Sequence, residues 1–229
     1  MSDAILAKVR KLLTKAEDPA CTTAEAEAFT AKATELIAKY GVDRALLAAQ
    51  DPSTDPVGDR VIDVEPPYAL DKAGLLASVA AALRCGSVRR RERGGLAVHL
   101  FGFGSDLERV ELLFTSLLVQ AAHGLAATPV PAWEQPAAFR RSWLAGFAGA
   151  IAVRLREAEA AAAATPTTSG PSVALVLADR TSKVSRRMSE AYPNARTAGR
   201  RRLAGTGMRQ GYAAGVAASL TDPRAVGQD

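Results

Sequence analysis

Histidine and cysteine are scarce in this sequence, and their scarcity argues against a metal site. The 229 residues include two histidines, His99 and His123, and two cysteines, Cys21 and Cys85, with no paired spacing among them. A structural zinc site needs about four such ligands close together. The motifs H-E-x-x-H, G-x-x-x-x-G-K-[ST] and G-x-S-x-G are also absent. We therefore predict no metal, no cofactor and no catalytic residue, and the sequence favours a non-enzymatic protein.

Long apolar runs and a secretory leader are also missing from the sequence. We find no run approaching the roughly 18 apolar residues of a membrane-spanning helix. The first residues lack a basic region followed by an apolar core. Cys21 and Cys85 lie far apart, so we interpret them as reduced thiols, with Cys85 a small buried residue rather than a nucleophile. These features predict a cytoplasmic protein without a membrane partner.

Acidic residues are sparse in the C-terminal third, which is therefore strongly basic. Residues 137–229 hold 14 Lys/Arg against six Asp/Glu, whereas the whole chain has a net charge of +5. Between residues 180 and 209 a single acid, Glu190, accompanies nine cations: Arg180, Lys183, Arg186, Arg187, Arg196, Arg200, Arg201, Arg202 and Arg209. Such a block favours a polyanion, because arginine binds phosphate bidentately. A solvated basic face explains it equally well.

The first 50 residues show the pattern of a helical hairpin. Apolar residues recur at three- and four-residue spacing on both sides of Pro19. Thr22 and Glu25 have the spacing of a capping box at the start of the second helix. Gly41 stands where a left-handed C-terminal cap is expected, and 42–49 could add a further helical turn. We predict one domain over 1–50, and the Pro-containing segment 51–59 as a linker.

The pattern changes to that of a β-hairpin near Gly94-Gly95. A short strand is predicted at 60–65 and a helix follows over 70–83. A two-residue turn would place arginines across from the apolar residues of the next strand. A three-residue turn over 93–95 instead places Val88 across from Leu100, and we predict this register because it pairs apolar side chains.

The predicted register determines which side chains share a face of the sheet with the arginines of the hairpin. Arg89 and Arg91 would share a face with His99 and Phe101. Charge beside an aromatic ring is typical of a nucleic-acid platform. Arginines on an edge strand also protect against aggregation, and this interpretation is the stronger of the two.

Four further helices and one strand complete the expected α+β fold. Ser105 and Glu108 have capping-box spacing ahead of a helix that ends near residue 124, and a long helix is expected over 139–164. The apolar run 173–177 is interpreted as a buried strand, followed by a basic helix over 180–191 and a final helix over 206–220. Residues 221–229 are expected to form a mobile tail.

Glycines recur on two of these helices. Gly207, Gly211 and Gly215 lie four residues apart on the last helix, as do Gly146 and Ala150 on the long one. Glycine inside a helix costs about 1 kcal/mol relative to alanine, and close packing of two backbones compensates for that cost. We predict that these two helices pack tightly, with phosphate binding by the glycines as the weaker alternative.

The N-terminal segment resembles the bacterial and phage domain of unknown function 2786. The pattern K-V-R-K-L-L … T-x-A-E-A … K-A-x-E-L-x-x-K-Y-G carries this resemblance through Lys8, Leu12, Leu13, Glu25, Ala26, Lys32, Ala33, Leu36, Tyr40 and Gly41. The downstream pattern G-F-x-S-D-x-x-x-x-E-x-L-F-x-x-L, a later F-x-x-x-W-x-x-G-F and a terminal G-x-x-A-G look like the region often attached to that domain. The resemblance implies a phage or mobile-element association and supplies no catalytic residue.

These observations lead to one fold and three functional hypotheses. We expect a hairpin domain over 1–50, a linker over 51–59 and an α+β domain over 60–220 in which several helices pack on a small sheet. The leading hypothesis is a DNA- or RNA-associated protein whose phosphate contacts come from Arg89, Arg91, Arg180, Lys183, Arg186, Arg187, Arg196, Arg200, Arg201, Arg202 and Arg209. The alternatives are a scaffold that docks a protein partner through its N-terminal hairpin, and an unrecognised hydrolase with a deep pocket holding carboxylates or His99.

Overall fold

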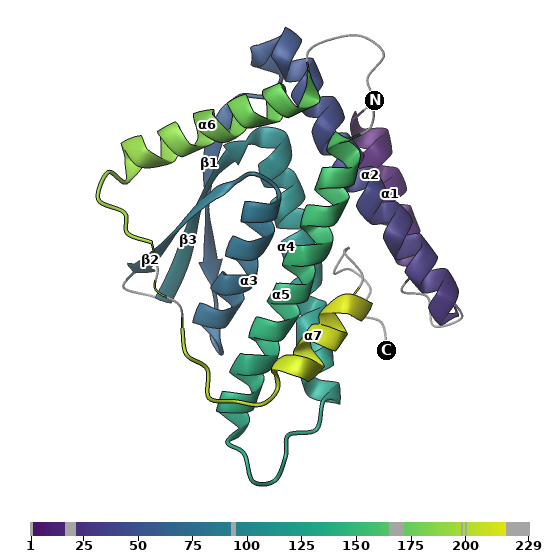
Figure 1. Cartoon of the computed structure of the whole chain (residues 1–229), viewed down its shortest axis with the longest axis vertical. Coiled ribbons are helices and arrows are strands. Elements are labelled where there is room, and N and C mark those ends of the chain that lie inside the picture. Colours follow the sequence, from purple (N-terminus) through teal and green to yellow (C-terminus); the bar gives the residue numbers. More distant parts are fainter. Residues whose placement is uncertain are drawn as a thin grey trace.

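The computed structural model has an α+β fold, as the sequence pattern predicts (Figure 1). It describes residues 2–16, 22–92, 95–164, 172–197, 199 and 201–218. These residues form a three-stranded sheet, seven α-helices and one short 3-10 helix, η1. In chain order the elements are α1 (Ser2–Ala16), α2 (Thr23–Gln50), η1 (Pro52–Thr54), β1 (Val57–Val64), α3 (Ala69–Ala82), β2 (Gly86–Glu92), β3 (Gly95–Phe103), α4 (Gly104–Ala127), α5 (Pro136–Ala163), α6 (Val173–Ala191) and α7 (Met208–Ala217).

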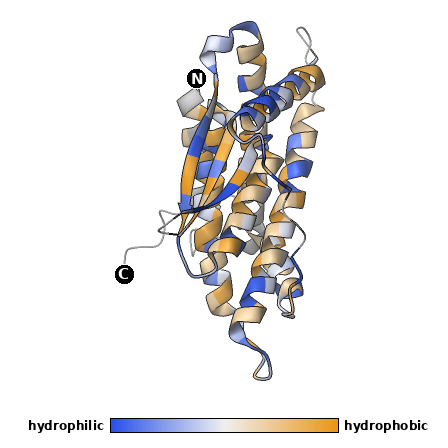
Figure 2. Ribbon diagram, turned by 90° about the vertical axis from the view of Figure 1, so that its left-hand side faces the viewer, coloured by the Kyte–Doolittle hydropathy of each residue, from blue (hydrophilic) through white to orange (hydrophobic). Residues whose placement is uncertain are grey.

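The sheet is antiparallel in the order β1-β3-β2 and is covered on both faces. Along β1, short stretches of hydrophobic residues alternate with short stretches of hydrophilic ones (Figure 2). Val98 and Leu100 of β3 enter the main core with helices α3, α4 and α5. Phe101 and Phe103 point to the opposite face, where Val184 of α6 packs on them. Helix α6 therefore lies across the second face of the sheet (Figure 1).

The register of the β2–β3 hairpin differs from the predicted one by one residue. Val88 lies across from His99, and the last pair is Glu92 with Gly95. Arg89 and Arg91 are therefore across from Val98 and Leu96, on the face turned toward the main core. Because side chains alternate along a strand, this shift separates both arginines from His99 and Phe101. The predicted platform of arginine beside an aromatic ring is wrong.

The second helix of the N-terminal segment begins where predicted, but it ends later than the predicted cap at Gly41. The Thr22 side chain accepts a hydrogen bond from the Glu25 backbone N–H, and the Glu25 carboxylate accepts one from the Thr22 N–H, which confirms the capping box. Helix α2 then continues through Gly41 to Gln50, so the predicted cap at Gly41 is wrong. Beyond its contact with α1, α2 packs on α5 and α6.

Two other local predictions are corrected by the structure. The run 173–177 is the first part of helix α6 and forms no strand. Its buried residues, Val173 and Leu177, continue at helical spacing into Arg180 and Val184, whereas Leu175 is 72% exposed. Ser105 does not cap α4, because its hydroxyl donates to Asp55 instead.

Asp55 takes over the role that we assigned to Ser105. Residues 51–59, expected as a linker, include η1, the start of β1 and the buried side chain of Asp55. This carboxylate accepts hydrogen bonds from the Ser105 N–H and hydroxyl at 2.9 and 2.7 Å. A negative charge at this position stabilises the positive N-terminal end of α4.

The glycines of α5 and α7 pack against each other's helices, as predicted. A Cβ atom added at Gly211 would lie 1.9 Å from the Trp143 carbonyl oxygen, and one at Gly146 would lie 2.1 Å from that of Met208. Both positions therefore need glycine so that the two backbones can approach. This contact fixes α7 on the side of α5 (Figure 1).

Helix α4 has the length and apolar content that a membrane-spanning helix requires. Length and composition alone would allow α4 to cross a membrane, although Thr115, Ser116 and Gln120 interrupt its apolar residues. In this fold Val110, Leu113 and Leu117 of α4 pack in the main core. Core helices meet the same criteria of length and composition.

Candidate functional site

Among the predicted phosphate-binding residues that the structure describes, Arg180 alone lies in the interior. It is 3% exposed, and its Nη2 atom lies 2.9 Å from Asp55 Oδ2 and 2.8 Å from Asp106 Oδ2. Its guanidinium also lies over the Phe103 ring, 3.6 Å from the centroid. The prediction that Arg180 contacts phosphates is corrected by this burial, because the guanidinium group is enclosed by the two carboxylates and the ring.

Three other predicted cations are exposed and paired with carboxylates. Lys183 binds Asp179 at 2.7 Å, one helical turn away on α6. Arg187 lies 3.2 Å from an Asp59 oxygen on β1, and Arg201 lies 2.6 Å from an Asp71 oxygen on α3. Pairing lowers their net charge, so these residues contribute less to an anion-binding surface than the sequence suggests.

Six arginines remain exposed without an ion pair to any other described residue. We call this set the basic surface, and its members are Arg89, Arg91, Arg186, Arg196, Arg202 and Arg209. The remaining predicted residue, Arg200, lies outside the described residues.

Strand β2, helices α6 and α7, and the segment between the two helices carry the basic surface, with Arg209 on α7. Arg89 and Arg91 lie on β2, an edge strand of the sheet. Arg186 points away from the buried stripe of α6, and the segment 192–207 carries the next two arginines to α7 (Figure 1). These arginines therefore lie at the edge of the sheet and at exposed positions along the C-terminal part of the chain.

The segment 192–207 is held to the rest of the fold at three points. The Tyr192 hydroxyl lies 2.8 Å from His99 Nδ1, and Arg201 binds Asp71. The Thr206 N–H and hydroxyl donate to Glu134 at 2.8 and 2.5 Å. The carboxylates of Asp71 and Glu134 therefore anchor this segment, so they are occupied and do not neutralise its remaining arginines.

His99 joins a polar cluster that the sequence did not predict. Its Nε2 atom lies 2.9 Å from Asp59 Oδ2, and Arg187 approaches the other oxygen of the same carboxylate. The hydrogen bond from His99, with the added charge of Arg187, lowers the pKa of Asp59 below its ordinary value. The cluster fastens the end of α6 and Tyr192 to the sheet, and the histidine is used for that contact.

A second charged network lies in the interior of the molecule. Asp106 binds Arg180 and Arg109, and Glu159 binds Arg109 and Arg84. With Asp55, three carboxylates and three guanidinium groups alternate along this chain of contacts. Their charges cancel, as burial requires. The members come from helices α4, α5 and α6, from the segment before β1 and from the connection between α3 and β2, so the network joins distant parts of the sequence.

Cys85 lies close to this network and is a poor nucleophile. Burial raises the pKa of its thiol, and the negative charge of Asp106 raises it further. The prediction of a small buried residue is confirmed.

The described carboxylates do not form a group suited to a metal ion. No cluster of three or more His, Cys, Asp or Glu side chains suited to a metal ion occurs in the part of the chain that the structure describes. A groove of about 590 Å³ between α2 and α5 contains Glu35, Asp43 and Glu157. Two of these are paired with lysines on their own helix: Glu35 with Lys32, and Asp43 with Lys39. The hydrolase hypothesis gains no support from this groove.

The N-terminal resemblance is confirmed by comparison with known families. Residues 4–44 match the family described as "Protein of unknown function (DUF2786)". These residues span α1 and most of α2, including Gly41 where it packs on Arg109. The match ends at residue 44, so the likeness of the downstream region stays a prediction. No curated protein and no solved structure matches the chain.

Proposed function

We propose that the protein is a cytoplasmic, non-enzymatic nucleic-acid-binding protein that contacts phosphates through the basic surface. One observation carries the proposal: the carboxylates nearest the C-terminal segment are occupied, whereas six arginines are exposed and unpaired among the described residues. Unpaired like charges in one part of a chain repel one another, and a polyanion relieves that repulsion.

The arrangement of the arginines favours binding that does not depend on base sequence. Helix α6 lies flat on the sheet with Arg186 on its outer side, and the other arginines lie on a strand edge and in an extended segment. Phosphate contacts position a protein on nucleic acid, whereas base contacts in a groove give specificity. The basic surface supplies the first kind of contact, so we expect similar affinities for unrelated sequences.

Fluorescence anisotropy with labelled single-stranded DNA, duplex DNA and RNA tests this proposal. Affinity should fall steeply as salt rises, because each neutralised phosphate releases bound counterions. In the double variant Arg186→Gln, Arg202→Gln, the slope of log K against log salt should decrease by about 0.9 for each phosphate that is no longer neutralised. The loss of affinity should be the same for different base sequences.

A matched variant separates this surface from general charge. Lys8→Gln, Lys11→Gln removes the same charge from exposed positions of α1 and should leave the salt slope unchanged. Equal weakening by both double variants, or binding that does not respond to salt, would contradict the proposal.

The scaffold hypothesis requires an exposed apolar patch on the N-terminal hairpin, and the burial of its described residues argues against such a patch. Ala33 is buried, while Phe29 and Leu36 are half-buried within the hairpin and core. Lys15 covers the Phe29 ring at 5.8 Å from its centroid. The side chain of Ala26 lies outside the described residues. Ala33 belongs to the main core and Leu36 packs against it, which leaves only the half-buried Phe29 of the described stripe outside the core, and we therefore favour nucleic-acid binding over protein docking.

A further inference from the structure

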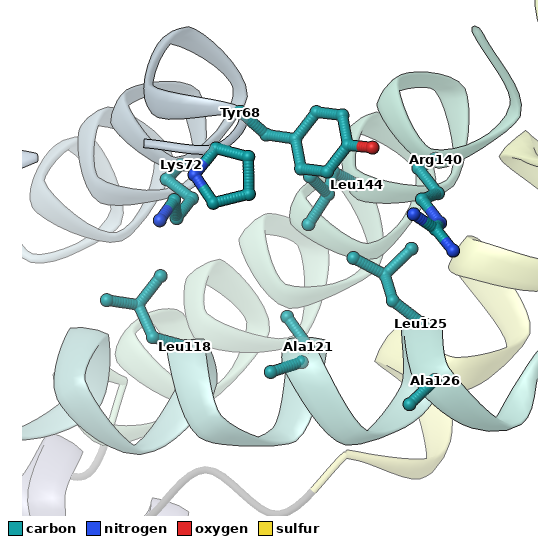
Figure 3. A pocket seen from close by; sticks show the side chains of 10 residues that line it. Tyr68, Lys72, Leu118, Ala121, Leu125, Ala126, Arg140 and Leu144 are labelled. Atoms are coloured by element: carbon teal, nitrogen blue, oxygen red, sulfur yellow. The ribbon is translucent and has the colours of Figure 1, made fainter. Parts of the chain in front are cut away.

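An apolar cleft opens between the start of α3, the second half of α4 and the start of α5. Its volume is about 370 Å³, within the range of sites that hold small organic molecules. Leu118, Leu125 and Leu144 form apolar walls, and Tyr68 leans over the opening (Figure 3).

The polar groups of the cleft carry charge of one sign. Lys72 and Arg140 line it at opposite sides of the opening, and no carboxylate is among the lining residues (Figure 3). Neither cation forms an ion pair with another described residue, although Arg141, the next residue, approaches Asp71. A half-buried ammonium and a guanidinium beside apolar walls favour an anionic group at the mouth of the cleft.

Tyr68 is held over the cleft by an unusual backbone conformation. Its φ of 62° is in the left-handed region that side chains other than glycine rarely adopt. The Tyr68 carbonyl accepts hydrogen bonds from the N–H groups of Asp71 and Lys72 at 2.9 Å each, so the first turn of α3 locks this conformation. Its hydroxyl is on the Arg140 side of the opening (Figure 3). Such outliers are frequent where a protein positions a side chain against a ligand.

We propose that this cleft binds a small amphiphilic carboxylate, a molecule of medium-chain fatty-acid type. The acyl chain lies against Leu118, Leu125 and Leu144, which removes it from water. The carboxylate accepts hydrogen bonds from Arg140 and the Tyr68 hydroxyl, and the charge of Lys72 adds attraction. This site shares no residue with the basic surface and does not depend on nucleic-acid binding.

Isothermal titration calorimetry of the full chain with three eight-carbon probes tests the proposal. Octanoate, octylammonium and octan-1-ol have the same apolar chain and differ in head-group charge. Octanoate should bind most tightly, octan-1-ol more weakly, and octylammonium should give no detectable heat at the same concentration. Arg140→Gln and Lys72→Gln should each weaken octanoate binding by about tenfold.

Two further variants connect binding to the cleft itself. Ala126 is an exposed lining residue of α4, so Ala126→Trp fills the cleft without changing the core and should abolish octanoate binding. Lys8→Gln on α1 removes one distant positive charge and should leave it unchanged, and circular dichroism confirms that each variant is folded. Failure of octanoate to bind at millimolar concentration overturns the proposal. Equal binding of octylammonium, or unchanged affinity of a folded Ala126→Trp variant, does the same.

Discussion

At the scale of one residue, Gly41 connects the segment that matches the family to the buried interior of the molecule. Its position within the helical pattern suggested a cap, yet α2 passes straight through it. A Cβ atom at this position would lie 2.1 Å from Nη1 of Arg109. Arg109 is 1% exposed and is held by Asp106 and Glu159, so its guanidinium cannot move aside without breaking a buried ion pair. The nearby carboxylates also raise the pKa of Arg109 against the opposing effect of burial.

Gly41→Ala should therefore destabilise the protein by about 1–3 kcal/mol, the usual cost of overpacking a buried site. Urea unfolding followed by circular dichroism measures this change. Gly149→Ala is the matched control, because Gly149 also lies inside a helix but faces open space. Higher helix propensity should make that variant about 0.5–1 kcal/mol more stable. A Gly41→Ala variant as stable as Gly149→Ala would show that Arg109 does not require glycine.

At the scale of elements, the end of one helix depends on a residue from a distant segment. Asp55 precedes β1 and accepts two hydrogen bonds from Ser105 at the start of α4. The same carboxylate binds Arg180 of α6. One side chain thus aligns the segment before β1 with two helices.

Asp55→Asn retains the shape of this side chain and removes its charge. The buried set of three carboxylates and three guanidinium groups then carries an uncompensated positive charge, so we expect a loss of about 3 kcal/mol in the free energy of unfolding. Asp51→Asn is the comparison, because Asp51 caps η1 in solvent and should contribute much less. Equal losses in the two variants, measured by urea unfolding, would contradict this view of the network.

Sequence patterns predicted the features that depend on the spacing of residues within one segment. The capping box of α2 and the glycine-spaced contact between α5 and α7 were both visible as spacings of a few residues. The need for glycine at position 41 inside a continuing helix was not visible, because its reason is Arg109 in another helix. The run 173–177 was ambiguous, since five apolar residues fit a strand or one side of a helix until the positions at 180 and 184 are included.

The candidate site was predictable in composition and only in part in arrangement. The excess of arginine over acid between residues 180 and 209 is a property of the sequence itself. Which arginines remain unpaired depends on Asp59, Asp71 and Asp106, which are 74 to 130 residues away from their partners. The hairpin register also could not be fixed by hydrophobic pattern, because a shift of one residue exchanges the two faces of a strand.

At the scale of the whole molecule, the C-terminal part of the chain is fastened across the fold by polar contacts. Helix α6 covers one face of the sheet, the segment 192–207 passes the start of α3, and α7 packs on α5 (Figure 1). One of these fastenings is the partly exposed cluster of Asp59, His99, Arg187 and Tyr192. Loosening that cluster should free the end of α6 while the main core stays intact.

The acid sensitivity of this fastening follows from Asp59. Its folded-state pKa is lowered by His99 and Arg187, so its contribution to stability is complete above the ordinary aspartate pKa and is lost as pH falls through the lowered value. Asp59→Asn should cost about 1 kcal/mol or less at neutral pH, since this carboxylate is partly solvated, and the difference from wild type should shrink toward zero in strong acid. Urea unfolding at a series of pH values measures both quantities. Asp63→Asn is the matched control on the same face of β1, an exposed carboxylate without an ion pair to another described residue. Its difference from wild type should show less dependence on pH, and an equal dependence would assign the effect to general charge.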